Sequence, residues 1–455
     1  MNLEALEIKR TLPMKKVNLQ PTQILAIGFA VLIIIGSLLL MLPIASKDGQ
    51  SLSFIDALFT ATSAVCITGL VVVDTATHFS LFGQLVILIL IQIGGLGIMT
   101  AATLVFLILG KKITLRERLV MQEALHQLNL SGLVKLTKYI IAFTFAIEGI
   151  GAVLLSFTFI KDYGLAKGIY YSIFHAVSAF NNAGFDLMGD FNSLTFYVEN
   201  PLVNLVIMTL VVVGGLGFSV IYDIFSKRNI RNLSLNSKVV LSTTAILLFT
   251  GFVLFYILEY SNPKTLGNLN PKGKILAAAF HSVTPRSGGF VTLNIKDMTT
   301  ASKYFTMLLM FIGASPGSTG GGIKVTTFAI IVMIINKIFA EKDDVELYGK
   351  RIPIDTIFKT MAIATISIIL LATCLFGLTL TERLDFLEIS FEAFSAIGTV
   401  GLSLGATPKL SNPGKILLMI AMFIGRLGHL SMIYILGTQK KKASMRYPEE
   451  RILIG

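Results

Sequence analysis

Long runs of apolar residues limit what this chain can fold into more than any other feature. A helix needs about 20 mostly apolar residues to cross a bilayer. Eight such segments cover residues 23–46, 79–110, 139–160, 201–222, 239–258, 304–336, 360–381 and 416–438. Only 14% of the 455 residues are charged, against about 25% in soluble domains. The sequence therefore predicts an all-α polytopic membrane protein with eight transmembrane helices.

The distribution of Lys and Arg predicts how these spans are oriented. If both termini and the even-numbered loops share one side, that side holds 24 of the 38 Lys and Arg residues and the other side holds 12. Loops rich in Lys and Arg remain in the cytoplasm, so both termini are predicted to be cytoplasmic. The net charge of +12 then reflects topology. The predicted partner of this charge is the lipid bilayer, through its anionic inner leaflet, or an acidic cytoplasmic protein, and not a nucleic acid.

Four segments between the spans share a pattern that recurs about every 110 residues. Each has a central phenylalanine, then Ser or Thr, then a glycine followed by Leu or Phe, as in FIDALFTATSAVCITGL. The glycines are Gly69, Gly184, Gly289 and Gly401. In three segments a serine precedes the glycine by six residues: Ser63, Ser178 and Ser395. Thr284 precedes Gly289 by only five, so Gly288 competes for the third position.

These segments have the properties of an ion filter. A half-helix can enter the membrane and return as extended backbone, which is stable there only beside protein or water. The helix C-terminus carries partial negative charge, and glycine lets several backbones crowd one axis with their carbonyl oxygens exposed. An outer amphipathic helix capped by glycine is the alternative for any single loop. Four matching loops favour four re-entrant pore helices in four tandem helix–pore loop–helix repeats around one pseudo-fourfold pore.

The repeats predict a division of the chain into seven parts. Residues 1–20 are a cytoplasmic N-terminus, 21–110 the first repeat, 111–130 a cytoplasmic amphipathic linker and 131–226 the second repeat. Residues 236–337 are the third repeat with a broken second helix, 353–438 the fourth repeat and 439–455 a cytoplasmic basic tail. Glycine-rich marks recur late in three repeats, as GGLG at 94–97 and 214–217 and GRLG at 425–428.

The sixth span contains the stretch GASPGSTGGGIK, which cannot remain helical. Each glycine costs about 1 kcal/mol in a helix interior and proline about 3 kcal/mol. One interpretation is a kink that serves packing, and the other is a mobile loop under the filter that obstructs the pore. The residues of this predicted gate are Gly313, Ala314, Ser315, Pro316, Gly317, Ser318, Thr319, Gly320, Gly321, Gly322 and Lys324.

Charged residues inside the spans are few, and each has two interpretations. Arg426 lies in the eighth span, where a charge costs at least about 2.5 kcal/mol and so should face the bundle interior. It either forms a structural ion pair, for instance with Glu148 of the third span, or forms an electrostatic barrier in a cation pore. Lys324 either extends toward the membrane surface or adds to that barrier.

Four polar residues beside the predicted pore loops also have simple structural explanations. Asn181 and Asn182 precede the second glycine, where their amides either bond to the filter backbone or cap a helix. His175 and His281 occupy matched positions in two repeats, and we expect them to pack within the outer helices because five histidines form no metal cluster.

The combination of four pore loops, one glycine in each, resembles the superfamily of potassium transporters. This superfamily includes the bacterial Trk and Ktr membrane subunits and the plant and fungal high-affinity (HKT) transporters. Over roughly residues 20–440 the chain looks most like the KtrB membrane subunits of bacterial Ktr systems. By that resemblance the filter residues are Cys66, Ile67, Thr68, Gly69, Asn182, Ala183, Gly184, Ser287, Gly288, Gly289, Thr399, Val400 and Gly401. Potassium channels have two glycines per filter strand, so one glycine predicts looser selectivity against sodium.

The same resemblance implies a function and partners. It implies potassium uptake in the plasma membrane of a bacterium, dependent on or activated by Na⁺, with K⁺ held by backbone carbonyls and no cofactor bound by this chain. It implies the gate role for the broken loop and the barrier role for Arg426. It also implies a homodimer with one pore in each chain and a cytoplasmic KtrA-type RCK ring that binds ATP and ADP.

Two other functions compete with a gated pore. A secondary permease that works by alternating access usually has inverted repeats and broken helices in both halves. Here the repeats look parallel and only the sixth span looks broken. A membrane enzyme needs clustered carboxylates, histidines or a nucleophile in its spans, and these spans hold few candidates. The chain is therefore predicted not to be an enzyme.

Overall fold

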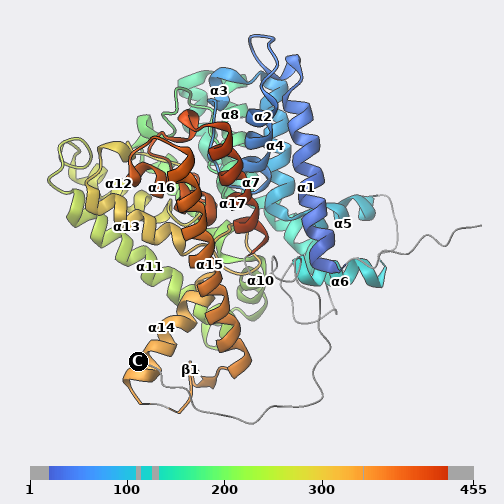
Figure 1. The fold of residues 1–455 in the computed structure, drawn as a ribbon, viewed down its shortest axis with the longest axis vertical. Helices are drawn as coiled ribbons and strands as arrows, with labels where there is room; N and C mark the ends of the chain where they lie inside the picture. Colours follow the sequence, from blue (N-terminus) through green and yellow to red (C-terminus); the bar gives the residue numbers. More distant parts are fainter. Residues whose placement is uncertain (1–19, 109–113, 125–132, 342, 429–455) are drawn as a thin grey trace, which may run out of the picture.

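The computed structural model describes residues 20–108, 114–124, 133–341 and 343–428, and its helices form four similar units (Figure 1). Each unit begins with a long helix: α1 (Pro21–Leu40), α7 (Leu133–Tyr163), α11 (Leu235–Glu259) and α15 (Ile354–Thr381). A shorter helix follows: α2 (Phe54–Val65), α8 (Leu165–Phe180), α12 (Pro271–Val283) and α16 (Phe386–Gly398). A second helix completes the unit: α4 (Leu81–Leu96), α9 (Pro201–Leu216), α13 (Thr300–Phe311) and α17 (Asn412–Leu427).

The long helices have the length and surface of membrane spans. Within the described residues, four helices are long and apolar enough to cross a membrane, and two bent pairs raise this number to six at most. The four are α1, α7, α11 and α15. On the outer faces of these helices, large apolar side chains such as Ile34, Phe249 and Ile368 are at least half exposed. Such faces suit contact with lipid chains, which make no hydrogen bonds.

Two of the second helices are sharply bent, which corrects the expectation that only the sixth span is broken. The axis turns by 101° between α4 and α5 (Ile98–Ile108), and by 93° between α9 and α10 (Phe218–Lys227). The bends lie at Gly97, with φ 81° and ψ 140°, and at Gly217, with φ 90° and ψ 136°. Only glycine adopts this backbone region without strain. The GGLG marks therefore end each helix and turn the chain aside.

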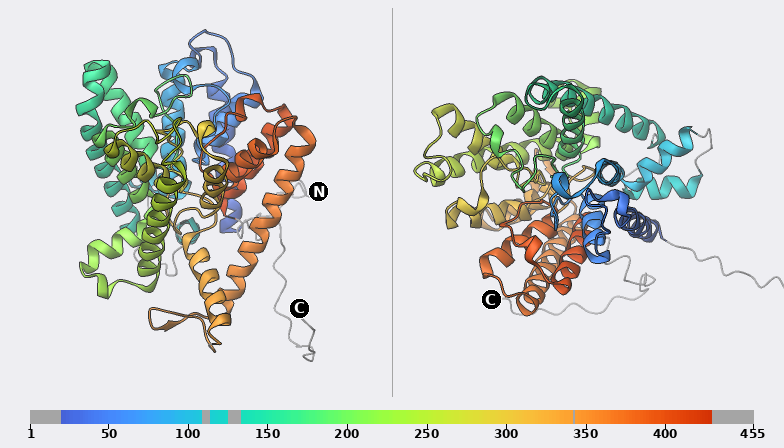
Figure 2. Two further views of the ribbon diagram at one scale, coloured as in Figure 1. Left: turned by 90° about the vertical axis from the view of Figure 1, so that its left-hand side faces the viewer. Right: turned by 90° about the horizontal axis from the view of Figure 1, so that it is seen from above.

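The four units form a closed ring. Each long helix packs on the short helix of its own unit, and each second helix also contacts the short helix of the next unit. These contacts join α4 to α8, α9 to α12, α13 to α16 and α17 back to α2. Seen from above, the units follow one another around a common centre (Figure 2, right). An ion pair of 2.6 Å between Lys415 of α17 and Asp56 of α2 joins the last unit to the first.

The remaining described elements connect these units. α6 (Leu115–Ala124) falls in the predicted amphipathic linker and packs on α1 and α7. α14 (Val325–Phe339) and the start of α15 project from one end of the molecule, joined by β1 (Glu346–Leu347) and β2 (Lys350–Arg351) (Figure 1). Short turns are α3 (Thr75–His78), η1 (Pro43–Ala45), η2 (Thr195–Tyr197), η3 (Ile230–Asn232), η4 (Ile295–Asp297) and η5 (Thr407–Lys409). The predicted tail at 439–455 and nearly all of the N-terminus at 1–20 lie outside the described residues.

Candidate functional site

The four glycines of the repeated sequence pattern, each more than 100 residues from the next, line one cavity. This cavity has a volume of about 750 Å³. Its lining contains Gly69, Gly184, Gly289 and Gly401, one from each unit. We refer to these four glycines as the pore ring and to the cavity above them as the vestibule.

The backbone has the same conformation in all four loops. The ring glycines have positive φ angles of 86° (Gly69), 69° (Gly184), 74° (Gly289) and 90° (Gly401). The residues two positions earlier are also left-handed: Ile67 (57°), Asn182 (58°), Ser287 (65°) and Thr399 (49°). Left-handed residues other than glycine are uncommon. Their recurrence at one position in four different sequences shows that the ring imposes a common path on the chain.

Backbone carbonyls fill the space beside each ring glycine. A Cβ atom built on Gly69 would lie 2.5 Å from the carbonyl oxygen of Ala183 in the next loop. On Gly289 it would lie 2.8 Å from the oxygen of Val400. Gly401 has the same close contact with the oxygen of Thr68. The residue before a glycine thus directs its carbonyl toward a neighbouring loop, and only glycine leaves room for it.

Gly289, and not Gly288, occupies the third position of the ring. In three loops the residue before the glycine donates its N–H to the short-helix serine carbonyl five residues earlier: Thr68 to Ser63 (2.8 Å), Ala183 to Ser178 (2.8 Å) and Val400 to Ser395 (2.9 Å). Gly288 makes the equivalent bond to Thr284, only four residues earlier, at 2.8 Å. The shorter spacing in the third loop is therefore absorbed at the end of its short helix.

The Ser/Thr position of the repeat binds the loop beyond the ring. The Ser178 hydroxyl donates to the carbonyl of Phe185 at 2.6 Å, and the Thr284 hydroxyl donates to that of Phe290 at 2.5 Å. In the fourth loop the Ser395 hydroxyl accepts from the Gly401 N–H at 3.1 Å. Ser63 of the first loop is buried without a hydrogen bond to its hydroxyl. The matched side chains thus hold three of the four strands directly.

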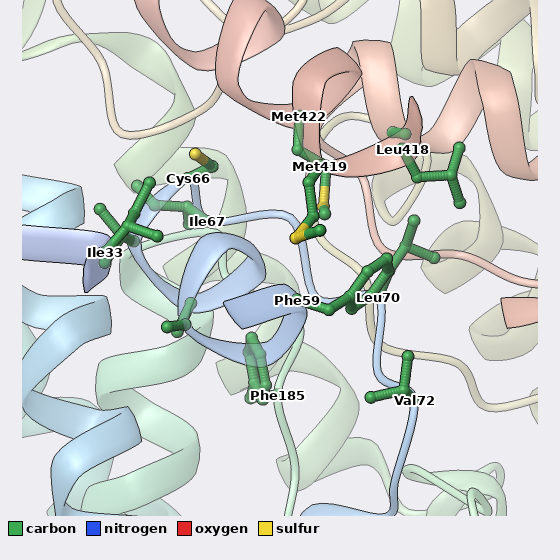
Figure 3. Close-up of a cluster of buried hydrophobic side chains, with 14 of the residues drawn as sticks. Ile33, Phe59, Cys66, Ile67, Leu70, Val72, Phe185, Leu418, Met419 and Met422 are labelled. Carbon is green, nitrogen blue, oxygen red and sulfur yellow. The ribbon is translucent and has the colours of Figure 1, made fainter. Parts of the chain in front are cut away.

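Apolar packing supports the first loop from behind. Figure 3 shows Phe59 of α2 beside Leu70, the residue after Gly69, with Met419 of α17 close to both. Phe59 and Leu70 are almost completely buried. The central phenylalanine and the residue after the glycine therefore anchor the loop in the core.

The broken sixth span places its loop directly under the ring. We define the gate loop as residues 313–324, between α13 and α14. Its backbone donates to the second unit, from Ser315 N to the carbonyl of Gly215 (3.0 Å) and from Thr319 N to that of Gly214 (3.2 Å). Gly321 approaches Thr399 and Ser287, and its N–H donates to the Ser287 hydroxyl at 3.4 Å. The loop therefore contacts the filter segments of the third and fourth units.

Arg426 joins the gate loop to the first unit. Its guanidinium donates to the carbonyls of Thr319, in the gate loop, and of Gly94, with a longer bond of 3.4 Å to Gly95. No carboxylate pairs with Arg426 among the described residues. The ion-pair interpretation with Glu148 is therefore wrong, because backbone carbonyls satisfy the guanidinium. Lys324 is half-buried and donates to the carbonyl of Gly320 within its own loop at 2.7 Å.

Glu148 belongs to a buried amide network that the sequence did not indicate. It accepts hydrogen bonds from Asn181 (2.9 Å) and Gln92 (3.2 Å). Asn181 also donates to Gln92 at 2.9 Å, so it serves this network and not the ring. The amide nitrogen of Asn182, oriented to satisfy both of its polar atoms, donates to the carbonyl of Val211 at 3.1 Å. Both asparagines therefore support the second pore loop from behind.

The two matched histidines make structural hydrogen bonds, as expected. One ring nitrogen of His175 lies 2.7 Å from the carbonyl of Tyr171, and the other accepts from Leu187 N at 3.3 Å. His281 lies 3.2 Å from the Thr306 hydroxyl. In the part of the chain that the structure describes, no group of three or more His, Cys, Asp or Glu is arranged to hold a metal ion.

The vestibule has charges that the sequence pattern did not single out. Its lining contains Asp74, Asp186 and Asp190 from the first two units and Lys264, Lys296 and Lys409 from the last two. Burial raises the pKa of Asp186 to about 7, and the charge of Asp74 adds to this, although hydrogen bonds from Met188 N and Ser193 lower it. The position of Asp186, two residues after Gly184, was the available signal in the sequence.

Comparisons with known proteins agree with this geometry. The sequence profile of the TrkH family, described as "Cation transport protein", matches residues 9–444. The Ktr system potassium uptake protein B of Bacillus subtilis (strain 168) is 46% identical, over 97% of this chain and 98% of the relative. The potassium/sodium uptake protein NtpJ of Enterococcus hirae is 43% identical, over 96% and 98%. The potassium transporter TrkH from Vibrio parahaemolyticus shares the fold, with a TM-score of 0.74 at 18% identity, over 93% of this chain and 86% of that one.

Proposed function

The chain belongs to the TrkH family of cation transport proteins, and from that membership we propose that it conducts potassium inward through a pore contained in the single chain. The resemblance seen in the sequence is thereby confirmed. Because the family consists of ion transporters, the prediction that this chain is not an enzyme is also confirmed. Its two most similar relatives reported above are named for potassium uptake and potassium/sodium uptake.

The closed ring of backbone at the floor of the vestibule is the observation that carries this proposal. Four short helices end within six residues of the ring glycines, so their partial negative charges converge on the axis. Carbonyl oxygens next to the glycines can replace the water around a potassium ion. The proposed filter consists of residues 66–69, 182–184, 287–289 and 399–401. One glycine per strand gives few ordered carbonyl layers, and hence looser selectivity against sodium than a potassium channel has.

The gate loop obstructs the pore in this proposal. Supporting this, it lies under the filter and contacts the second, third and fourth units directly, and the first through Arg426. An unneutralised guanidinium under the filter repels cations, so Arg426 acts as an electrostatic barrier that slows conduction. Conduction then requires the loop and the arginine to move away from the axis together, because the Thr319 carbonyl joins them.

Regulation and assembly follow from the Ktr resemblance. We propose eight spans with cytoplasmic termini in a bacterial plasma membrane. Some of these spans are continuous helices, and the others are formed by the bent and broken helices. The chain acts as a homodimer with a cytoplasmic, nucleotide-binding partner of the KtrA type, on which ATP and ADP act. The printed name of the NtpJ relative supports a role for Na⁺ as well as K⁺.

A permease that works by alternating access is the second candidate function. The bends at Gly97 and Gly217 favour it, because discontinuous helices are common in such permeases. The four units, however, follow one another in the same order around one axis, whereas alternating-access folds usually contain inverted repeats. The ring therefore favours a gated pore.

The proposal is tested in a bacterial strain that lacks its own potassium uptake systems. Expression of this chain with a KtrA-type partner should restore growth at limiting K⁺ and should restore Rb⁺ uptake. Sorbitol-loaded cells without K⁺ or Na⁺ gradients serve as controls for nonspecific leak. The proposal is refuted if the chain is present in the membrane with its partner co-expressed and takes up no Rb⁺. Uptake that requires a second solute to be exported would favour the permease.

A further inference from the structure

We propose that Asp186 recruits the cation to the outer mouth of the filter and thereby sets the affinity for external K⁺. This inference rests on the proposed function, since it concerns the step before the ion enters the ring. It assigns a role to one side chain of the vestibule, whereas the filter itself is built from backbone.

The four units place one side chain each in a second ring above the glycines. The residue directly after each glycine is buried in the core: Leu70, Phe185, Phe290 and Leu402. The next residue is half-buried and lines the vestibule: Val71, Asp186, Val291 and Ser403. Asp186 is the one carboxylate among these four equivalent positions. An ion that approaches the filter must pass this ring, so a charge there acts on every ion that enters.

The loop holds Asp186 in a fixed position. Its Oδ1 atom accepts from Met188 N at 3.0 Å. The residue before it is held by the Ser178 hydroxyl, and the residue after it donates its N–H to His175. In the part of the chain that the structure describes, no Lys or Arg forms an ion pair with its carboxylate. The carboxyl group is therefore held in place beside the mouth without a resident counterion, and it carries its charge above its raised pKa.

Other carboxylates near the mouth accept hydrogen bonds that hold the outer loops, or lie farther from the ring glycine in the sequence. Asp74 accepts from Thr77 N (2.7 Å) and Phe191 N (2.9 Å), which joins the outer loops of two units. Glu392 is buried and accepts from the hydroxyls of Ser403 (2.5 Å) and Thr407 (2.6 Å). Asp190 is exposed on the vestibule wall.

The lysines of the vestibule come from other units than Asp186. Lys264 and Lys296 belong to the third unit and Lys409 to the fourth. Their charges repel a cation from these units, so the field in the vestibule directs it toward the second unit. Such fields raise the local concentration of an ion and weaken with ionic strength.

The test measures Rb⁺ uptake by the full chain with its partner at pH 8.5, where the carboxylate is ionised. Asp186→Asn keeps the oxygen that accepts from Met188 N but removes the charge, and should raise KM by about fivefold with little change in maximal rate. Asp190→Asn, on the same wall, is the matched control and should change KM much less. Adding Val71→Asp to Asp186→Asn moves the charge to the equivalent position of the first unit and should recover much of the affinity.

These results distinguish loss of the Asp186 charge from distortion of the surrounding turn as the cause of a raised KM. An unchanged KM in Asp186→Asn overturns the inference. A raised KM that persists undiminished at high ionic strength, set with a non-permeant salt, also overturns it, because a distorted turn is not screened whereas a charge is. This salt comparison remains decisive if the Val71→Asp variant does not fold. If the unaltered chain takes up no Rb⁺, the proposed function fails and not this inference alone.

Discussion

The pore ring and the gate loop are both glycine-rich backbone on one axis, but different parts of the molecule hold them. Each strand of the ring is bonded to the short helix of its own unit, as Ala183 N is to the Ser178 carbonyl. The gate loop is bonded within itself, as Gly313 N is to the Ile323 carbonyl, and also to other units through Gly214, Gly215 and Arg426. The comparison shows that each ring strand is held within its own unit, whereas the gate loop also depends on hydrogen bonds to neighbouring units.

The largest effect should come from adding a side chain to the ring. In Gly401→Ser the Cβ would clash with the Thr68 carbonyl at a φ of 90°. Left-handed strain of about 1–2 kcal/mol and a displaced carbonyl together should reduce the preference for K⁺ over Na⁺ by about 100-fold. Competitive uptake of Rb⁺ and Na⁺ measures this. Gly49→Ser is the control, because Gly49 has a φ of 66° but no neighbour within 4 Å of the added atom. Equal behaviour of both variants would remove Gly401 from the filter.

Shortening the gate loop should increase the rate of uptake. Deleting residues 316–321 removes the backbone under the ring and should raise the Rb⁺ uptake rate about tenfold, as expected for a barrier lowered by roughly 1.4 kcal/mol. Ser318→Ala, which keeps the loop backbone, should change the rate little. A deletion variant that is folded and present in the membrane but transports nothing would mean that the loop is not a gate.

Arg426 distinguishes charge from bonding within the gate. Arg426→Ala removes both the charge and the bonds to Thr319 and Gly94, and should raise the uptake rate about fivefold. Arg426→Lys keeps a charge under the filter without the forked hydrogen bonds, and should remain close to the original rate if the charge forms the barrier. A fast Arg426→Lys variant would show instead that the bonds keep the loop closed.

The smallest effect should come from the hydroxyls behind the ring. Ser178→Ala removes the 2.6 Å bond to the Phe185 carbonyl, and should reduce the preference for K⁺ over Na⁺ about threefold. Ser63→Ala is the matched control in the first unit, because the Ser63 hydroxyl makes no hydrogen bond in the structure. An equal loss in both variants would show that side-chain bonding does not fix the strands.

The sequence predicted the membrane class, the four units and their glycines. It did so because these features are local: apolar runs, one serine at a fixed distance from one glycine, and a stretch with too many glycines for a helix. It missed the bends at Gly97 and Gly217, because a glycine within an apolar run reads equally well as a close helix contact or a turn. It also left open an ion pair between Arg426 and a carboxylate such as Glu148, because a buried charge is often paired with an opposite one.

Residue order alone therefore determined that four glycine-bearing loops exist and that one span is broken by the gate loop. Only the tertiary structure decided which units are neighbours, that Gly289 takes the third position of the ring, and that backbone carbonyls satisfy Arg426. The physical reason is that these outcomes depend on main-chain atoms from segments about 100 or more residues apart. Every residue has the same main-chain groups, so side-chain patterns do not record where those groups meet.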